Sequence, residues 1–188
     1  MNDVVYAQQY YPPGTEIDIN GTRFCILDYG VEYPGLIKVI SADRIWPDVS
    51  YGYNSNWRDS SLRDCLNHGL MFDRIKSVFG KSRMYFFSRD LVSIDGYENG
   101  CCFDLVSILT LSEYAQYRHI LRRQQNVGPW WLLTPRSTKF GGDGNSVFFV
   151  QDNGIVDFQD SNCKCGVRPV VTTDISILAK SEEVKDGG

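Results

Sequence analysis

The stretch Pro129-Trp130-Trp131-Leu132-Leu133-Thr134-Pro135, with Gly166-Val167-Arg168-Pro169 further along, decides how this chain folds. Trp130–Leu133 is a short apolar run, which is typical of a buried strand. The elements expected around it are a polar loop over Pro135–Asn145, a strand over Ser146–Val150, a turn at Asp152-Asn153-Gly154, a return strand over Ile155–Phe158, a loop over Asp160–Cys165 and a closing strand over Val167–Thr173. The C-terminal third is therefore predicted to be β-sheet with polar loops.

Upstream of this segment, strands and helices are expected to alternate. Asn20-Gly21 between two β-prone runs predicts a hairpin. The expected elements are strands over Glu16–Ile19, Thr22–Tyr29 and Gly35–Ser41, a helix capped by Ser61 through a capping box with Asp64 and ending near Asn67–Gly69, a short helix over Leu70–Phe79, an irregular excursion over 80–100, a buried strand over Phe103–Leu111, and a helix capped by Ser112 that ends near Asn126–Gly128. We expect an α+β domain over 15–178, an N-terminal arm over 1–14 and a disordered tail over 179–188.

Composition and charge argue against some classes of binding partner. The chain has 188 residues, enough for one ordinary domain, and a net charge of −4. An acidic chain is poorly suited to nucleic acid or to anionic membrane surfaces, so we expect neither as a partner. The first residues lack the basic and apolar regions of a signal peptide, and no apolar run is long enough for membrane insertion. The protein is therefore expected to be cytoplasmic unless it leaves inside a virion.

Six cysteines are present, and without a secretory signal they are interpreted as mostly free thiols, several of them buried. These are Cys25, Cys65, Cys101, Cys102, Cys163 and Cys165.

Four spaced segments together resemble a known type of domain. They are Trp57 with Ser61-Leu62-Arg63 and Leu66-Asn67, then Leu109-Thr110-Leu111-Ser112, then Trp130 to Pro135, then Gly166 to Val171. In this order they resemble an uncharacterised domain family of gut bacteria and their phages. The same ending resembles the variable proteins of diversity-generating retroelements and the formylglycine-generating-enzyme branch of C-type-lectin-like folds. Leu133 stands where the family usually has Arg.

The resemblance covers about residues 15 to 175 and implies a C-type-lectin-like domain. Two helices would pack on a small twisted antiparallel sheet, and long loops would project from one side. In the variable proteins the ligand faces the loop after the Trp strand and the hairpin before the Gly-Val-Arg-Pro segment. The corresponding stretches here are Arg136–Asn145 and Gln151–Lys164.

Candidate ligand-binding residues follow from those two stretches. The loop is too long for a tight turn, and loops of this length are usually functional or mobile. Cationic and aromatic side chains serve well at contact surfaces. The predicted ligand-binding residues are Arg136, Lys139, Phe140, Asp143, Asn145, Gln151, Asp157, Gln159 and Asn162. A flexible connector is the competing interpretation of the loop.

The motif residues themselves are interpreted mainly as scaffold. Trp130 and Trp131 alternate sides of a strand, so either both are structural or one faces a loop or groove. Arg168 is expected to form a buried or half-buried ion pair that fixes the last strand. Pro169 cannot donate to a ladder, which indicates an edge or a bulge.

We expect no catalytic residue, no cofactor and no metal site. Asp and Asn side chains in the C-terminal loops could offer oxygen ligands to Ca²⁺, but Asp and Asn beside Gly are usually turn residues, and no EF-hand spacing exists. Cys163 and Cys165 lie near the place where formylglycine-generating enzymes bind copper, but nothing else of that catalytic motif is present. His68 and His119 lie on predicted helices without a nucleophile motif.

Three functions are consistent with these observations. The first is a non-enzymatic binding module, on a phage virion as a tail or head decoration for host attachment, or in a gut bacterium, that presents its loops to a protein or glycan. The second is an intracellular structural or partner-binding protein, including an anti-defence role. The third is a copper enzyme of the formylglycine-generating type. Whether the chain forms a homo-oligomer is left open.

Overall fold

The computed structural model describes residues 2–30, 33–122, 127–136 and 144–179, and it has the expected mixture of helices and strands. The helices are α1 (Asn2–Tyr10), α2 (Ser61–Asn67), α3 (Leu70–Phe79) and α4 (Leu111–Leu121), with short 3₁₀ turns at Trp57–Asp59 and Lys81–Arg83. The strands are β1 (Glu16–Ile19), β2 (Thr22–Tyr29), β3 (Leu36–Ser41), β4 (Trp46–Ser50), β5 (Met84–Tyr85), β6 (Phe87–Val92), β7 (Glu98–Asp104), β8 (Val106–Ser107), β9 (Trp130–Pro135), β10 (Ser146–Val150), β11 (Val156–Asp160), β12 (Lys164–Val167) and β13 (Val170–Asp174). The α+β prediction is confirmed.

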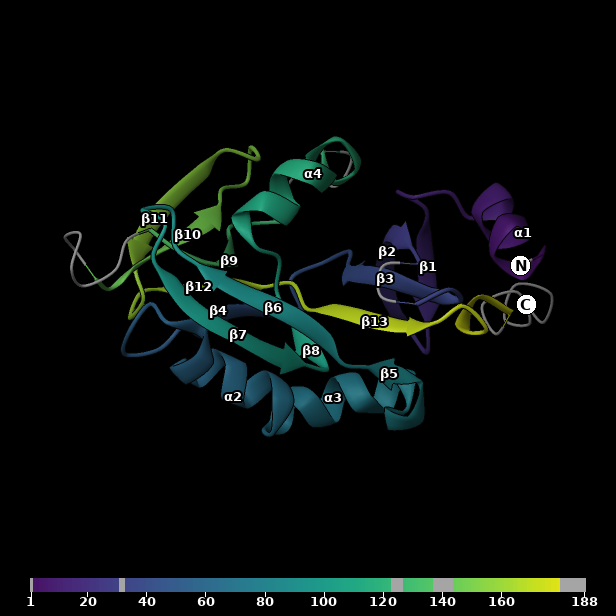
Figure 1. The fold of residues 1–188 in the computed structure, drawn as a ribbon, viewed down its shortest axis with the longest axis horizontal. Helices are drawn as coiled ribbons and strands as arrows, with labels where there is room; N and C mark the ends of the chain where they lie inside the picture. Colours follow the sequence, from purple (N-terminus) through teal and green to yellow (C-terminus); the bar gives the residue numbers. More distant parts are fainter. Residues whose placement is uncertain (1, 31–32, 123–126, 137–143, 180–188) are drawn as a thin grey trace.

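The strands are divided among three sheets instead of one small sheet. One has the order β1-β2-β3-β13-β5, with β8 also paired to β13. The second has the order β11-β10-β9-β12-β4, and its β12–β9 pair is parallel. The third is the hairpin of β6 and β7. In Figure 1 the first two sheets lie at opposite ends of the long axis, α2 and α3 run along one side, and α4 lies on the other.

Both predicted hairpins with an Asn-Gly turn are confirmed. Asn20 and Gly21 have φ of 50° and 78°, the left-handed conformation that a tight turn between β1 and β2 requires. The turn at Asp152-Asn153-Gly154 connects β10 to β11, whose register pairs Val150 with Val156. The strand predictions over 16–29, 35–41 and 146–150 and the helix prediction over Leu70–Phe79 agree with the structure.

Two helix starts differ from the prediction by one or two residues. The α2 cap is Ser60, whose side chain accepts a hydrogen bond from the Arg63 backbone N–H, so Ser61 is the first helical residue. The α4 cap is Thr110, which forms a reciprocal capping box with Glu113, so Ser112 lies inside the helix. In both cases a neighbouring hydroxyl residue is placed where its backbone is still extended.

Three larger predictions are wrong. Residues 80–100 are not irregular, because they contain β5, β6 and the start of β7. Phe103–Leu111 is not one strand, because it spans the end of β7, β8 and the first residue of α4. The closing strand is two strands, and the chain passes from one sheet to the other at Arg168-Pro169. Pro169 lacks the N–H that a continuous ladder would need.

The predicted N-terminal arm is a helix that contacts the domain. Ala7 of α1 is buried, and the Tyr29 hydroxyl donates a hydrogen bond to the Tyr11 carbonyl at 2.6 Å. At the other end of the chain, residues 180–188 of the predicted disordered tail lie outside the described residues.

Two hydrophobic cores lie on opposite faces of shared strands. Trp131 and Leu133 of β9 point into one core, and Trp130 and Leu132 point into the other. The first core is covered by α2 and α3 and the second by α4, since Leu66 and Ile75 belong to one and Tyr114 and Tyr117 to the other. Both Trp side chains are buried, at 2% and 0% exposure, so the interpretation that both are structural is confirmed.

Candidate ligand-binding groove

A groove of about 610 Å³ lies between β6 and the start of α4. Its size falls in the range of small-ligand sites, roughly 300–1,000 Å³. One wall is the segment 88–94, the opposite wall is 110–115, and Thr134 of β9 lies between them. The lining residues are Ser88, Arg89, Asp90, Val92, Ser93, Ile94, Thr110, Leu111, Ser112, Glu113, Ala115 and Thr134.

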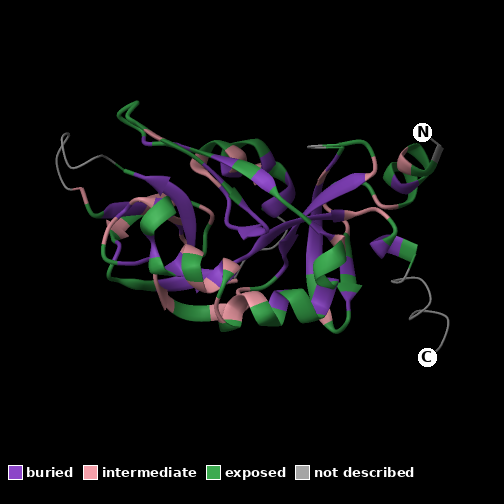
Figure 2. Cartoon of the chain, turned by 60° about the horizontal axis from the view of Figure 1, so that its bottom comes forward, coloured by how far each residue is buried: buried purple, intermediate pink, exposed green. Residues whose placement is uncertain are grey.

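The β6–β7 hairpin forms because its side chains alternate between an inner and an outer face. Phe87, Arg89 and Leu91 are buried, and the residues between them are exposed. The connection is a tight turn, in which Gly96 has φ of 79° and donates its N–H to the Ser93 carbonyl. Figure 2 shows that the end of this hairpin extends away from the body and is exposed.

Arg89 and Glu113 connect the two walls of the groove. The Arg89 guanidinium donates to both Glu113 carboxylate oxygens, at 2.8 and 2.6 Å, and also to the Ile108 carbonyl at 2.8 Å. Lys38 Nζ of β3 lies 3.0 Å from the same carboxylate. Arg89 is 2% exposed, so this is a buried ion-pair network.

The network fixes the charge of Glu113. Burial opposes ionisation of its carboxyl group, but the Arg89 and Lys38 charges and the hydrogen bonds from Arg89 and the Thr110 N–H outweigh it, so the pKa of Glu113 is far below its usual value. Glu113 is therefore a permanent anion at neutral pH, bonded to cations. A carboxylate in this state is poorly suited to exchange protons with a substrate.

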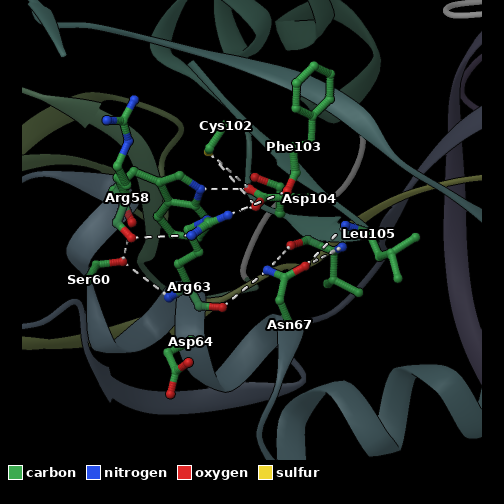
Figure 3. Close-up of polar contacts among 12 residues, drawn as sticks. Arg58, Ser60, Arg63, Asp64, Asn67, Cys102, Phe103, Asp104 and Leu105 are labelled. Carbon is green, nitrogen blue, oxygen red and sulfur yellow. Dashed lines mark hydrogen bonds and ion pairs between the residues drawn. The ribbon is translucent and has the colours of Figure 1, made fainter. Parts of the chain in front are cut away.

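A second buried ion pair holds the hairpin from its other side. Asp104 of β7 is fully buried and accepts hydrogen bonds from Arg63 Nε and Trp57 Nε1, both at 2.7 Å (Figure 3). Next to it, the Asn67 side-chain oxygen accepts from the N–H groups of Leu105 and Val106 at 3.0 and 3.2 Å. The hairpin is thus held by α2 on one side and by α4 on the other, and the groove is preformed.

The start of α4 is fixed to β9 as well. Thr134 Oγ1 accepts a hydrogen bond from the Leu111 N–H at 2.9 Å, and the Leu133 N–H donates to the Leu109 carbonyl at 2.7 Å. These contacts place the Thr110 and Ser112 hydroxyls at the groove, 3.0 Å from each other.

The residues predicted from sequence lie away from this groove, on the β10–β11 hairpin and its ends. Gln151 and Asp157 contact each other, since the amide of Gln151 donates to the Asp157 carboxylate at 2.9 Å. Gln159 pairs with Val147 and is half-buried. Asn145 and Asn162 are exposed at the far end of the hairpin. Lys139, Phe140 and Asp143 lie outside the described residues.

Arg136 is the predicted residue whose surroundings best suit contact. Its guanidinium lies 3.7 Å from the centre of the Phe158 ring, and that ring is 41% exposed. Phe158 pairs with Phe148, which packs against the core under α4. The Arg136–Phe158 pair is therefore on the same face of the sheet as α4, whereas Gln159 and Asp157 share the opposite face with Val147 and Phe149.

The residues of the Gly166–Val171 segment are all buried, as a scaffold role requires. Arg168 is 1% exposed, its Nε donates to the Ser41 carbonyl at 2.9 Å, and its guanidinium lies 5.1 Å from the Trp130 ring centre. Burial lowers the pKa of Arg168 to about 10. The expected ion pair of Arg168 stays a prediction.

The cysteines agree with the prediction of free thiols. None of the six forms a disulfide bond, and Cys25, Cys102 and Cys165 are buried. Burial raises the pKa of Cys165 to about 12, so it is a neutral thiol at neutral pH. A copper site with Cys163 would have to deprotonate it. Within the described ranges, no three His, Cys, Asp or Glu side chains converge as metal ligands.

The chain matches no protein-family model, no curated protein and no solved structure. Within the part of the chain that the structure describes, no helix is both long and apolar enough to cross a bilayer.

Sequence reasoning missed the groove because it placed no strand in residues 80–100. A signal was present: Asp95-Gly96 favours a hairpin turn, and polar Ser88 and Asp90 alternate with Phe87 and Leu91. Arg89 at an inward position disguised that alternation, since a cation is rarely buried unless it is paired. Its partner Glu113 lies on a helix more than twenty residues away, and the sequence alone does not pair them.

Proposed function

We propose that this chain is a non-enzymatic binding module that presents the groove and the separate Arg136–Phe158 surface to a protein or glycan. The observation that carries the proposal is a preformed groove of about 610 Å³ whose two walls are joined by the buried Arg89–Glu113 pair. A preformed concave site is the usual form of a small-ligand binding site. The charged side chains that join its walls, Arg89 and Glu113, are bonded to each other. This arrangement suits a structural role better than acid–base chemistry.

The finer form of the proposal is a C-type-lectin-like domain of a phage virion, as a tail or head decoration, or of a gut bacterium. It is supported by the four ordered segments from Trp57 to Val171 that resemble such domains. Their side chains have scaffold positions: Trp57, Arg63 and Asn67 hold β7, and Trp130 and Trp131 fill the two cores.

The test uses the purified, fluorescently labelled chain on a panel of bacterial surface glycans, surface proteins and whole cells. Ala115→Trp would fill the groove, because Ala115 is an exposed wall residue, and Gln116→Trp is the matched control next to it, outside the lining. We expect binding to at least one target, lost in Ala115→Trp and kept in Gln116→Trp. If the chain binds no target and is absent from purified virions, the proposal is contradicted.

A second candidate, an intracellular partner-binding protein, is favoured by the six free thiols. Free cysteines persist where the surroundings are reducing. A stoichiometric partner recovered from host cytoplasm by the wild-type chain, and not by Ala115→Trp, would support this function over the virion form.

A further inference from the structure

The groove runs along an unpaired edge of a β-strand. Among the described residues, β6 pairs only with β7. The wall residues from this hairpin all belong to β6 and to the start of its turn, at 88–94, and none belongs to β7. The groove therefore lies on the side of β6 that faces away from its partner strand. On that side, alternate residues of an edge strand present unpaired N–H and C=O groups.

This edge has the length of a typical strand. β6 ends at Val92, so the extended part of this edge is 88–92, which spans roughly 15 Å at about 3.3 Å per residue and accommodates about five residues of an added strand. The opposite wall is the first two turns of α4, where the small side chains of Ser112 and Ala115 leave room beside β6. The Arg89–Glu113 pair holds the two walls at a fixed separation.

The side chains along the edge select among occupants. Among the described residues that line the groove there is no aromatic ring, so they offer a sugar no ring on which to stack. Val92 and Ile94 are 44% and 61% exposed and offer apolar contact. Asp90 is exposed, and no cation is described beside its carboxylate, whereas Glu113 is already bonded to Arg89 and Lys38. The charge available to a ligand is therefore negative.

We infer that the groove binds an extended polypeptide segment, which adds as a third strand to the free edge of β6, with a basic side chain near Asp90 and apolar side chains near Val92 and Ile94. Backbone hydrogen bonds would give affinity, and these side-chain contacts would give specificity. The inference rests on the proposed binding function and commits it to a protein ligand.

The experiment pans a displayed library of random 12-residue peptides against the full chain and measures the selected synthetic peptides by fluorescence anisotropy. We expect peptides with basic and apolar residues at alternating positions. Asp90→Lys and Ala115→Trp should each weaken binding by about tenfold or more, and binding should slow amide hydrogen exchange in 88–92. Peptides N-methylated at one set of alternate residues should lose binding, and those methylated at the other set should keep it, because only alternate N–H groups face β6.

Two control variants match these changes. Glu98→Lys has the same charge change on β7 of the same hairpin, and Gln116→Trp has the same bulk beside Ala115; both lie outside the lining. Each should change the affinity by less than about twofold. Thermal unfolding of every variant checks that it is folded.

The outcomes separate this inference from the proposed function. Strand addition is overturned if peptide affinity is unchanged in both Asp90→Lys and Ala115→Trp. It is also overturned if N-methylation of neither set of alternate peptide residues weakens binding. A glycan whose binding is lost in Ala115→Trp overturns the peptide occupant and upholds the binding module. If no peptide, glycan or cell surface is bound, both fail.

Discussion

Glu113 is the residue on which the groove depends most. Its carboxylate accepts hydrogen bonds from Arg89, Lys38 and the Thr110 N–H. Glu113→Gln keeps the shape but leaves two buried cations without an anion. Removing one partner of a buried pair costs about 3–5 kcal/mol, and we expect a loss of that order in the free energy of unfolding, measured with urea. Glu98→Gln, at an exposed position, should cause a much smaller loss.

The same residue gives this loss a pH dependence. The pKa of Glu113 is lowered in the folded state, so its contribution to stability is complete above the unfolded value of about 4.3 and is lost as pH falls toward the folded value. The stability difference between wild type and Glu113→Gln should therefore be constant near pH 7 and shrink below pH of about 4. A difference that stays constant down to pH of about 2.5 would contradict the ion-pair assignment.

Gly166 is required by space and not by backbone conformation. A Cβ at this position would lie 2.1 Å from Arg44 Cδ and 2.6 Å from the Pro129 carbonyl oxygen. Gly166→Ala should destabilise the fold by about 1–3 kcal/mol or more, because β12 must move away from its neighbours. Adding Arg44→Ala should recover part of the loss, since the Pro129 backbone cannot retreat as a side chain can. Full recovery in urea unfolding would show that Arg44 alone sets the limit.

At the scale of elements, the sequence predicted those that are specified locally. Asn20-Gly21, Asp152-Asn153-Gly154 and the apolar spacing of Leu70–Phe79 each specify a turn or helix within a few residues, and these agree with the structure. The strand break at Arg168-Pro169, in contrast, is set by long-range pairing with other strands. β12 pairs with β9 and β4, and β13 pairs with β3, so the two halves of an apparently continuous strand belong to different sheets.

The groove could not be predicted for a related reason. Its walls come from β6 and α4, and the pairs that join the hairpin to the body are Arg89–Glu113 and Arg63–Asp104. Long-range pairs of charged residues leave no periodic pattern, and buried ions oppose the apolar pattern that marks a strand. Of the residues predicted for binding, the described ones lie on or beside the β10–β11 hairpin, and Gln151 and Asp157 contact each other.

The β6–β7 hairpin should loosen as one element when its α2 contact is weakened. Asp104→Asn preserves size but removes the charge that Arg63 and Trp57 share. We expect faster amide hydrogen exchange across Phe87–Asp104, with β1–β3 unchanged, because Asp104 is the buried charged link from β7 to Arg63 of α2. Asp160→Asn, at an exposed position at the end of β11, is the control and should leave the hairpin unchanged. Exchange in Asp104→Asn that matches wild type would show that other contacts, such as Arg89–Glu113, hold the element without Asp104.

At the scale of the whole molecule, the two cores depend on each other. β2 contributes Phe24 and Ile26 to one core and Leu27 to the other. β9 does the same with its two Trp residues, and β13 with Val170 and Val171. Each core therefore packs on one face of strands whose opposite face packs in the other core. Because removing either core exposes the shared strands, we expect the molecule to unfold in one step.

The buried cysteines can test this, because they report from different cores and different sheets. Cys25 lies on β2 in the core under α4, and Cys165 lies on β12 in the core covered by α2 and α3. If the cores open only together, both thiols should react with a thiol reagent at the same slow rate, with the same dependence on urea. Exposed Cys101 and Cys163 should react at once and serve as internal controls. Mass spectrometry of the labelled peptides measures each site. A Cys165 that reacts well before Cys25 would mean that its sheet opens alone, and the shared strands would then not couple the two cores.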